Sequence, residues 1–115
     1  KAFGSAIAEF QAVQFMLADM FMDIEAARLL VYRAAALVDA GKIGKENARY
    51  FSTAKTFAAD MAMKAAVDGV QILGGAGYMK DHPMERFMRD AKQIQIVEGT
   101  SQIQRMIIAR NLLDL

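Results

Sequence analysis

The sequence predicts an all-α fold, an antiparallel up-and-down bundle of helices. Two long segments, residues 7–40 and 45–73, carry apolar residues at alternating spacings of three and four, which is the period of an α-helix. Glycines and the single proline separate the helical segments from one another. No stretch shows a convincing strand pattern, and no internal repeat or low-complexity segment interrupts the helical reading.

The first predicted helix covers residues 7–40 and, at about 1.5 Å per residue, is about 50 Å long. Phe15, Phe21, Met22 and Leu29 lie off its main apolar stripe, so several faces of this helix are expected to be buried. The main stripe consists of Phe10, Val13, Leu17, Met20, Ile24, Ala27, Val31, Ala34 and Val38.

A turn at residues 41–44, which contains two glycines, ends this helix. The second predicted helix begins at Lys45 or Glu46 and runs to about Leu73, and Asp68 interrupts its apolar stripe. Because the turn is short, the two helices are expected to be antiparallel neighbours. The stripe consists of Phe51, Ala54, Ala58, Met61, Ala65 and Ile72.

The last third of the chain predicts two shorter helices. The run Gly74-Gly75-Ala76-Gly77 breaks the second helix, and Pro83 suits the first turn of a short helix that reaches about Ala91. Residues 92–99 are expected to form a connector, and the final helix runs over residues 102–113.

Thr100 or Ser101 is the expected N-cap of this final helix. Ser101 and Gln104 also have the spacing of a capping box. The apolar face of the final helix consists of Ile103, Ile107, Ile108 and Leu112.

Composition indicates that this protein buries more surface than one small core. The chain has 115 residues, of which 55% are hydrophobic and nine are Met. Met-rich surfaces also mark adaptable binding sites, but core filling and subunit packing are the preferred explanation. Two long helices cannot bury several apolar faces each without more protein, so we expect an oligomer or a domain of a larger subunit. The missing initiator Met also predicts a fragment of a longer chain.

Charge and residue usage exclude several classes of function. The 14 basic and 13 acidic residues leave a net charge of +1, which gives no case for nucleic acid or an anionic membrane. No apolar run is long enough to span a membrane, and the first residues lack a signal-peptide pattern. The absence of cysteine excludes disulfides and suits a reducing compartment, and a single His82 excludes a histidine-rich metal site. We therefore expect no bound metal.

The glycine run and the residues beside it have two readings. Successive glycine N–H groups can form an anion site, and Gln71, one turn earlier, can donate to a ligand or a neighbouring chain. The alternatives are a helix end with a tight turn and an exposed glutamine, and the residues alone favour them.

The charged residues between 85 and 92 are expected to be structural. Glu85 and Arg89 are four residues apart and can pair at the surface of a helix. His82, next to Pro83, is expected to be a loop residue rather than a base.

Glu98 is the most informative acid of the chain. It follows an apolar tripeptide and precedes Gly99 and a capping pair, on a loop between two helices. Apolar walls would raise the pKa of this carboxyl toward the value that a general base requires. The alternative, a solvated loop acid, has equal support from these observations.

Taken together, these motifs strongly resemble the acyl-CoA dehydrogenases over nearly the whole chain. In the second half the motifs are Gln71-Ile72-Leu73-Gly74-Gly75-Ala76-Gly77-Tyr78, Pro83-Met84-Glu85-Arg86, Arg89-Asp90-Ala91-Lys92 and Glu98-Gly99-Thr100-Ser101-Gln102-Ile103-Gln104-Arg105. In the first half they are Phe3-Gly4, Phe10-Gln11, Gln14-Phe15, Leu17-Ala18-Asp19-Met20 and Ala27-Arg28-Leu29-Leu30.

The resemblance implies that residues 1–115 are a single domain, the family's C-terminal helical bundle, missing its first helix. It also implies a homotetramer, a dimer of dimers, in the bacterial cytoplasm or the mitochondrial matrix. Such enzymes oxidise an acyl-CoA to the trans-2-enoyl-CoA and pass electrons to electron-transferring flavoprotein. A glutamate removes the α-proton while the β-hydrogen leaves as hydride to FAD.

The resemblance places this catalytic base at Glu98, an arrangement of the short- and medium-chain type. The N–H of Glu98 would hold the thioester carbonyl, and Gly99 would bend the loop beside the substrate. Thr100 and Gln102 would contact FAD. The residues implied to contact the FAD of a neighbouring subunit are Phe3, Gln11, Gln71, Gly74 and Gly75.

Some positions depart from the family pattern, and two other functions stay open. Val97 stands where a tyrosine is common and Ala2 where Thr or Arg is common, and the arginine expected just before Lys1 is not in the chain. These changes affect one wall of the acyl pocket and part of the pyrophosphate site. The alternatives are an acyl-CoA oxidase and a non-catalytic helical oligomerisation module. Glu98 and the glycine run argue against the module, and we expect the isolated fragment to be inactive.

Overall fold

The computed structural model describes residues 1–115, and the predicted all-α class is confirmed because these residues form helices and no strand. Two 3-10 turns, η1 (Ile7–Glu9) and η2 (Lys45–Asn47), precede the two long helices. The α-helices are α1 (Gln11–Asp39), α2 (Ala48–Leu73), the single turn α3 (Gly75–Tyr78), α4 (Met84–Ile94) and α5 (Ser101–Leu112).

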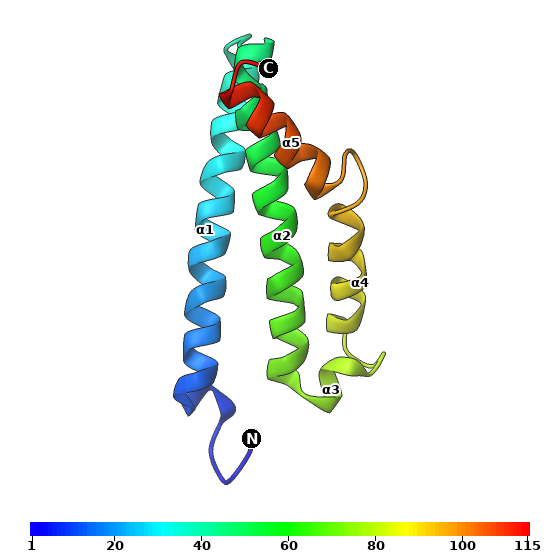
Figure 1. Ribbon diagram of the computed structural model, residues 1–115. Helices are drawn as coiled ribbons and strands as arrows, with labels where there is room; N and C mark the ends of the chain where they lie inside the picture. The colour runs from blue at the N-terminus through cyan, green and yellow to red at the C-terminus, as the bar shows by residue number, and fades with distance from the viewer.

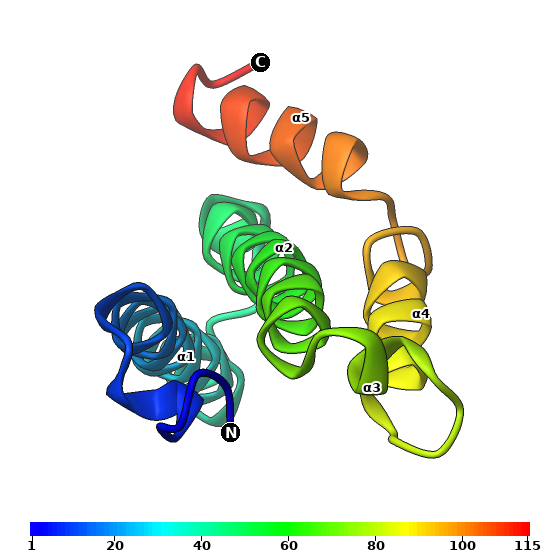
Figure 2. The same cartoon turned by 90° about the horizontal axis from the view of Figure 1, so that it is seen from below.

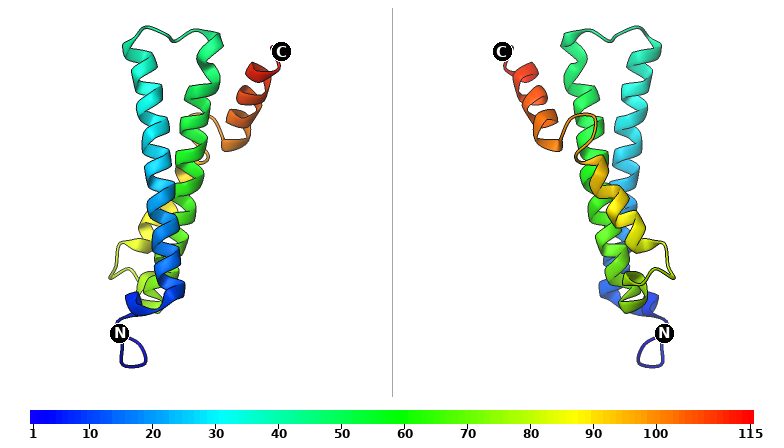
Figure 3. Two further views of the ribbon diagram at one scale, coloured as in Figure 1. Left: turned by 90° about the vertical axis from the view of Figure 1, so that its left-hand side faces the viewer. Right: turned by 90° about the vertical axis from the view of Figure 1, so that its right-hand side faces the viewer.

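α2 is the centre of the bundle, and it contacts α1, α3, α4 and α5 (Figure 2). α1 and α2 lie side by side and antiparallel, as predicted, and α4 runs antiparallel to α2 on another side (Figure 1). α5 leaves the end of α4 and crosses α2 at an angle (Figure 3). The start of α1, the end of α2 and α3 lie at one end of the bundle (Figure 1).

α1 begins four residues later than the periodicity predicts. Residues 7–9 form the 3-10 turn η1, and Phe10 has an extended backbone with ψ of 127° before α1 begins at Gln11. The side chain of Gln14 donates to the carbonyl of Ala8 at 3.0 Å and ties this turn to the helix. The 29-residue helix is therefore about 43 Å long rather than about 50 Å.

The chain turns between α1 and α2 at the predicted glycines, but α2 begins at Ala48 rather than at Lys45 or Glu46, because residues 45–47 form η2. Gly41 has φ of +69°, a conformation that costs little only for glycine, and the N–H of Lys42 donates to the carbonyl of Leu37 at 2.8 Å. The side chain of Asn111 in α5 donates to the carbonyl of Lys45 at 2.6 Å. The link is therefore fastened to the last helix.

The glycine run contains both a helix end and a close contact. Gly74 ends α2 with φ of +61°. A Cβ on Gly77 would lie 2.8 Å from the Leu73 Cβ and from the Val70 carbonyl oxygen, because α3 folds back against α2. A Cβ on Gly75, in contrast, would meet nothing within 4 Å.

α4 and α5 differ from the prediction at the connector between them. α4 continues three residues past Ala91 to Ile94, so the connector is shorter, residues 95–100. Thr100 is the N-cap of α5, and its hydroxyl accepts from the N–H of Ile103 at 3.2 Å. The predicted capping box of Ser101 and Gln104 is wrong, because the Gln104 side chain instead donates to the carbonyl of Glu98.

The expected surplus of apolar surface is confirmed. Only nine residues are buried, and none of them has a large side chain. Phe15, Phe21 and Leu29, which lie off the main stripe of α1, are 60%, 66% and 67% exposed. No helix combines the length and the apolar character that a membrane crossing requires.

Candidate functional site

Glu98 lies on the turn between α4 and α5, in a backbone conformation that is unusual for its residue type. Its φ is +54°, in the left-handed region, and Gly99 follows with φ of +88°. Such outliers persist where the surroundings hold them, and they concentrate at functional sites. The Glu98 carboxylate makes no hydrogen bond or ion pair with another group of the chain.

The predicted apolar walls around Glu98 are not supplied by this chain. Glu98 is exposed, and the preceding Ile96 and Val97 are themselves 56% and 40% exposed. Any apolar enclosure of the carboxylate must therefore come from outside these residues.

The backbone carbonyls of Glu98 and Gly99 accept hydrogen bonds, whereas the N–H of Glu98 has no partner in the chain. The carbonyl of Glu98 accepts from Nε2 of Gln104 at 3.0 Å, and the carbonyl of Gly99 accepts from Nζ of Lys55 at 2.6 Å. The N–H of Glu98 donates to no group of the chain. A fixed N–H without a partner is the kind of donor that can bind a developing oxyanion.

Asp60 in α2 fastens both sides of the same loop. Its carboxylate accepts from Nε2 of Gln95 at 2.8 Å and from Oγ of Ser101 at 2.9 Å, and it pairs with Arg105. Burial raises the pKa of Asp60, but the hydrogen bonds from Arg105, Gln95 and Ser101 outweigh it, so the pKa lies below its ordinary value. Asp60 is therefore a charged anchor rather than a proton donor.

Thr100 and Gln102 line a polar cavity of about 280 Å³ next to this loop. The hydroxyl of Thr100 accepts from the N–H of Ile103 and keeps its own proton for a further acceptor. Gln102 is exposed and offers an amide. The other lining residues are Asp60, Lys92, Gln95, Ile96, Ser101 and Arg105. These donors and acceptors suit a polar heterocycle such as a flavin edge.

The other five predicted cofactor residues form a second, separate group. Gln11 is the first residue of α1, Gln71 is in the last turn of α2, and Gly74 and Gly75 follow it. These elements lie at one end of the bundle (Figure 1). Phe3, Gln11, Gln71, Gly74 and Gly75 are all exposed. The open space beside Gly75 lets a ligand approach its backbone, which fits a phosphate group.

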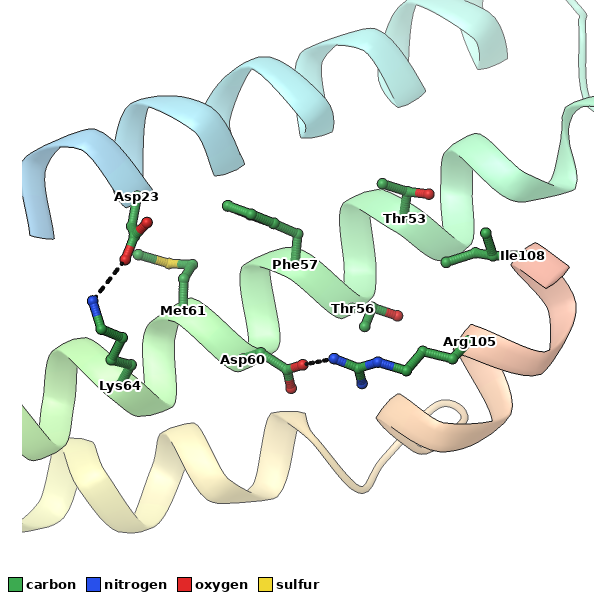
Figure 4. A pocket seen from close by; sticks show the side chains of 9 residues that line it. All are labelled: Asp23, Thr53, Thr56, Phe57, Asp60, Met61, Lys64, Arg105 and Ile108. Carbon is green, nitrogen blue, oxygen red and sulfur yellow. Dashed lines mark hydrogen bonds and ion pairs between the residues drawn. The ribbon is translucent and has the colours of Figure 1, made fainter. Parts of the chain in front are cut away.

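The largest cavity, about 410 Å³, contains none of the predicted site residues. Figure 4 shows two ion pairs on its walls, Lys64 with Asp23 and Arg105 with Asp60. Apolar side chains lie between the two pairs. The complete lining is Asp23, Thr53, Thr56, Phe57, Asp60, Met61, Lys64, Arg105 and Ile108. Asp60 therefore belongs both to this wall and to the support of the Glu98 loop.

The remaining charged candidates lie on α4 and on the turn before it. Nε of Arg89 donates to Glu85 at 2.9 Å on the surface of α4, which confirms the predicted pair. The guanidinium of Arg89 lowers the pKa of Glu85. His82 is exposed on the turn before α4. No cluster of His, Asp or Glu side chains is arranged to hold a metal ion.

Three residues that hold the loop are absent from the sequence-based candidates: Lys55, Asp60 and Gln104. A weak signal exists for two of them, because Lys55 and Asp60 each follow a buried alanine, Ala54 or Ala59, in a helix rich in small residues. A charge beside the closely packed side of a helix must find a partner. The sequence gives no indication that this partner is the Glu98 loop.

Comparison with known proteins gives consistent matches over the whole chain. The family described as acyl-CoA dehydrogenase, C-terminal domain, matches residues 1–113. The probable acyl-CoA dehydrogenase FadE25 of Mycobacterium tuberculosis is 57% identical over 114 residues, which is 98% of this chain and 28% of that protein.

Solved structures agree with this match. Butyryl-CoA dehydrogenase from Megasphaera elsdenii superposes with a TM-score of 0.92 and 45% identity, over 98% of this chain and 29% of that chain. A structure described as the electron transferring flavoprotein of Acidaminococcus fermentans matches with a TM-score of 0.92, 52% identity and the same coverage. The chain thus spans less than a third of the length of the proteins that it matches.

Proposed function

The chain belongs to the acyl-CoA dehydrogenase family, and from this premise we propose that the protein that contains it oxidises acyl-CoA thioesters to trans-2-enoyl-CoA with bound FAD. In this proposal, residues 1–115 are one helical domain of a longer chain. The observation that carries the proposal is the Glu98 turn. It combines a left-handed acid, a free carboxylate and a free N–H with two anchored carbonyls.

Glu98 is the proposed base. Its carboxylate takes the proton from the α-carbon of the acyl group, and the electron pair of that C–H bond becomes the second bond between the α- and β-carbons. The hydrogen on the β-carbon leaves with its own electron pair, so the substrate loses two hydrogens and two electrons. When bound, FAD supplies the acceptor for that hydrogen and electron pair.

The free N–H of Glu98 gives the same residue a second role. Removal of the α-proton builds negative charge on the thioester carbonyl, and a preorganised N–H there stabilises the charge by roughly 3–4 kcal/mol. This N–H lies past the end of α4 and donates to no carbonyl of the chain. The loop therefore presents a proton acceptor and a hydrogen-bond donor from one residue.

We assign the FAD contacts to two groups, in line with their separation in the fold. Thr100 and Gln102, beside the Glu98 loop, face the flavin of their own subunit. Phe3, Gln11, Gln71, Gly74 and Gly75, at the end of the bundle, contact the FAD of a neighbouring subunit. This division requires an assembly, and the exposed apolar side chains of every long helix supply the surface for a homotetramer, a dimer of dimers.

Electron-transferring flavoprotein is the proposed electron acceptor, supported by the 52% identity to a chain of the Acidaminococcus fermentans structure. An acyl-CoA oxidase would instead pass its electrons to oxygen. Reoxidation of the reduced full-length protein by each acceptor separates the two. The proposed compartment is the bacterial cytoplasm or the mitochondrial matrix.

The decisive experiment replaces the base in the full-length protein. Glu98→Gln keeps the size and polarity of the side chain, and it should retain FAD, seen by its visible absorbance, while anaerobic bleaching by acyl-CoA is abolished. Glu46→Gln, an exposed acid on the link before α2, is the matched control and should bleach normally. Turnover by Glu98→Gln would disprove the assignment of the base, and a full-length protein without flavin would favour the non-catalytic module.

A further inference from the structure

The loop that carries Glu98 rests on a lysine that lies far from it in the sequence. Nζ of Lys55, in α2, donates to the carbonyl of Ile94 at 2.8 Å and to the carbonyl of Gly99 at 2.6 Å. Ile94 is the last residue of α4, and Gly99 directly follows Glu98. One ammonium group therefore bridges the two sides of the loop at its base.

Asp60 makes a parallel bridge five residues further along α2. It links Gln95, at the start of the loop, to Ser101, at the start of α5. The charges also suit the helix ends, because Lys55 lies at the C-terminus of α4 and Asp60 at the N-terminus of α5. Two charged residues of α2 therefore hold the loop. The Lys55 ammonium donates to backbone carbonyls, and the Asp60 carboxylate accepts from side-chain donors.

The Lys55 contact acts on the backbone next to the proposed base. Its Gly99 acceptor belongs to the second peptide after the Glu98 Cα, and Gln104 holds the first through the Glu98 carbonyl. These two contacts restrict the backbone that follows the Glu98 Cα, and the peptide that carries the Glu98 N–H lies between the two carbonyls that Lys55 binds, those of Ile94 and Gly99. The left-handed φ of Glu98 is a costly conformation, and it needs such restraint to persist.

We propose that Lys55 is a positioning residue for the reaction, which holds the Glu98 carboxylate and N–H in register with the substrate; this inference rests on the proposed function of Glu98. Lys55 makes no ion pair with a carboxylate, unlike Lys64 on the same helix, which pairs with Asp23. Its donors serve two uncharged carbonyls, one at each side of the loop. Contacts of this kind are expected of a residue that positions the loop backbone, rather than of one that only adds an ion pair to the surface.

The test uses the full-length, FAD-bound protein and the acyl-CoA that it oxidises fastest in a panel of short-, medium- and long-chain thioesters. Lys55→Met removes the ammonium and keeps much of the apolar stem. The rate constant of anaerobic flavin bleaching should fall about 10- to 100-fold, because small misplacements of a reacting group cost rates of this order. FAD content and the half-saturating acyl-CoA concentration should stay within about twofold.

Two further variants separate positioning from folding. Lys55→Arg keeps a charged donor and should recover part of the lost rate. Lys64→Met removes the same charge from the same helix, away from the loop, and should bleach at the wild-type rate. If Lys55→Met does not fold, Lys55→Gln serves in its place, with the bleaching rate expected to be at least about fivefold lower.

Several results would overturn the inference. One is a wild-type bleaching rate in Lys55→Met or Lys55→Gln. Another is a fall of the bleaching rate in Lys64→Met as large as that in Lys55→Met. The third is a variant in which only the half-saturating acyl-CoA concentration changes. Glu98→Gln, measured beside them, separates this inference from the proposed function. Bleaching by Glu98→Gln refutes the function, whereas an inert Glu98→Gln with unaffected Lys55 variants refutes only the role of Lys55.

Discussion

The side-chain amide of Gln104, in the first turn of α5, donates to the carbonyl oxygen of Glu98 at 3.0 Å. The same Nε2 lies 2.5 Å from the place that a Cβ on residue 99 would occupy, so this contact and a side chain at position 99 exclude each other. Gly99 is thus required by its neighbour as well as by its φ of +88°.

Replacement of Gln104 should therefore disturb the loop. In Gln104→Leu the Glu98 carbonyl loses its donor, and we expect the free energy of unfolding to fall by about 1 kcal/mol. We also expect the flavin bleaching rate to fall about tenfold, since the first peptide after Glu98 is no longer held. Denaturant titration and stopped-flow absorbance measure the two effects. Gln93→Leu, at an exposed position of α4, is the control, and an equal effect there would argue against a specific contact.

The two glycines that flank Ala76 should respond differently to alanine. Gly77→Ala places a methyl 2.8 Å from the Leu73 Cβ and from the Val70 carbonyl oxygen, and it should destabilise the fold by about 1–3 kcal/mol. Gly75→Ala meets nothing within 4 Å and should leave unfolding unchanged, but it should weaken FAD retention during dialysis. A Gly75→Ala protein with normal FAD affinity would remove Gly75 from the proposed phosphate contact.

Asp60 predicts how stability depends on pH. Because its folded-state pKa lies below the ordinary value, the unfolded chain binds more protons when the pH falls below about 4. The stability that Asp60 provides is complete above that range and is lost as pH falls through the lowered pKa. Thermal melts should show Asp60→Asn to be less stable than wild type at neutral pH, with the gap narrowing in acid. A gap that is independent of pH would mean that the carboxylate charge is not what stabilises the loop.

Residues 1–115 expressed alone should be catalytically inert even with added FAD. Glu98 is exposed in this chain, and only one small polar cavity adjoins its loop, so the substrate has no enclosed site. Chromatographic detection of enoyl-CoA after incubation with acyl-CoA and an artificial electron acceptor is the measurement. Enoyl-CoA formation above the no-protein background would contradict the prediction.

The long helices were predictable because many apolar positions repeat with one period, whereas their ends were not. The turns at residues 7–9 and 45–47 have the composition of a helical turn, and only their hydrogen bonds make them 3-10. The end of α4 was missed for the opposite reason, because Lys92 and Gln93 resemble connector residues but continue the helix. Local composition does not distinguish these cases.

The candidate site was predictable where its residues are neighbours in the sequence. Positions 98–100 hold an acid, a glycine and a capping residue. This pattern predicts an exposed turn before a helix, and the structure has that turn. Lys55 and Asp60 act on residues 35 to 45 positions away, through single side chains. Such contacts produce no periodic pattern in the sequence. They become visible only when α4 and α5 are seen packed on α2.

The length of α2 fixes the distance between the two ends of the bundle. Lys55 lies at the support of the Glu98 loop and Gly75 lies just past the end of the same straight helix, about 30 Å away at about 1.5 Å per residue. One inserted or deleted residue between them would rotate one end about 100° against the other. The length of α2 therefore sets the distance and the relative rotation of the two proposed binding regions, although none of the residues between them need touch a ligand.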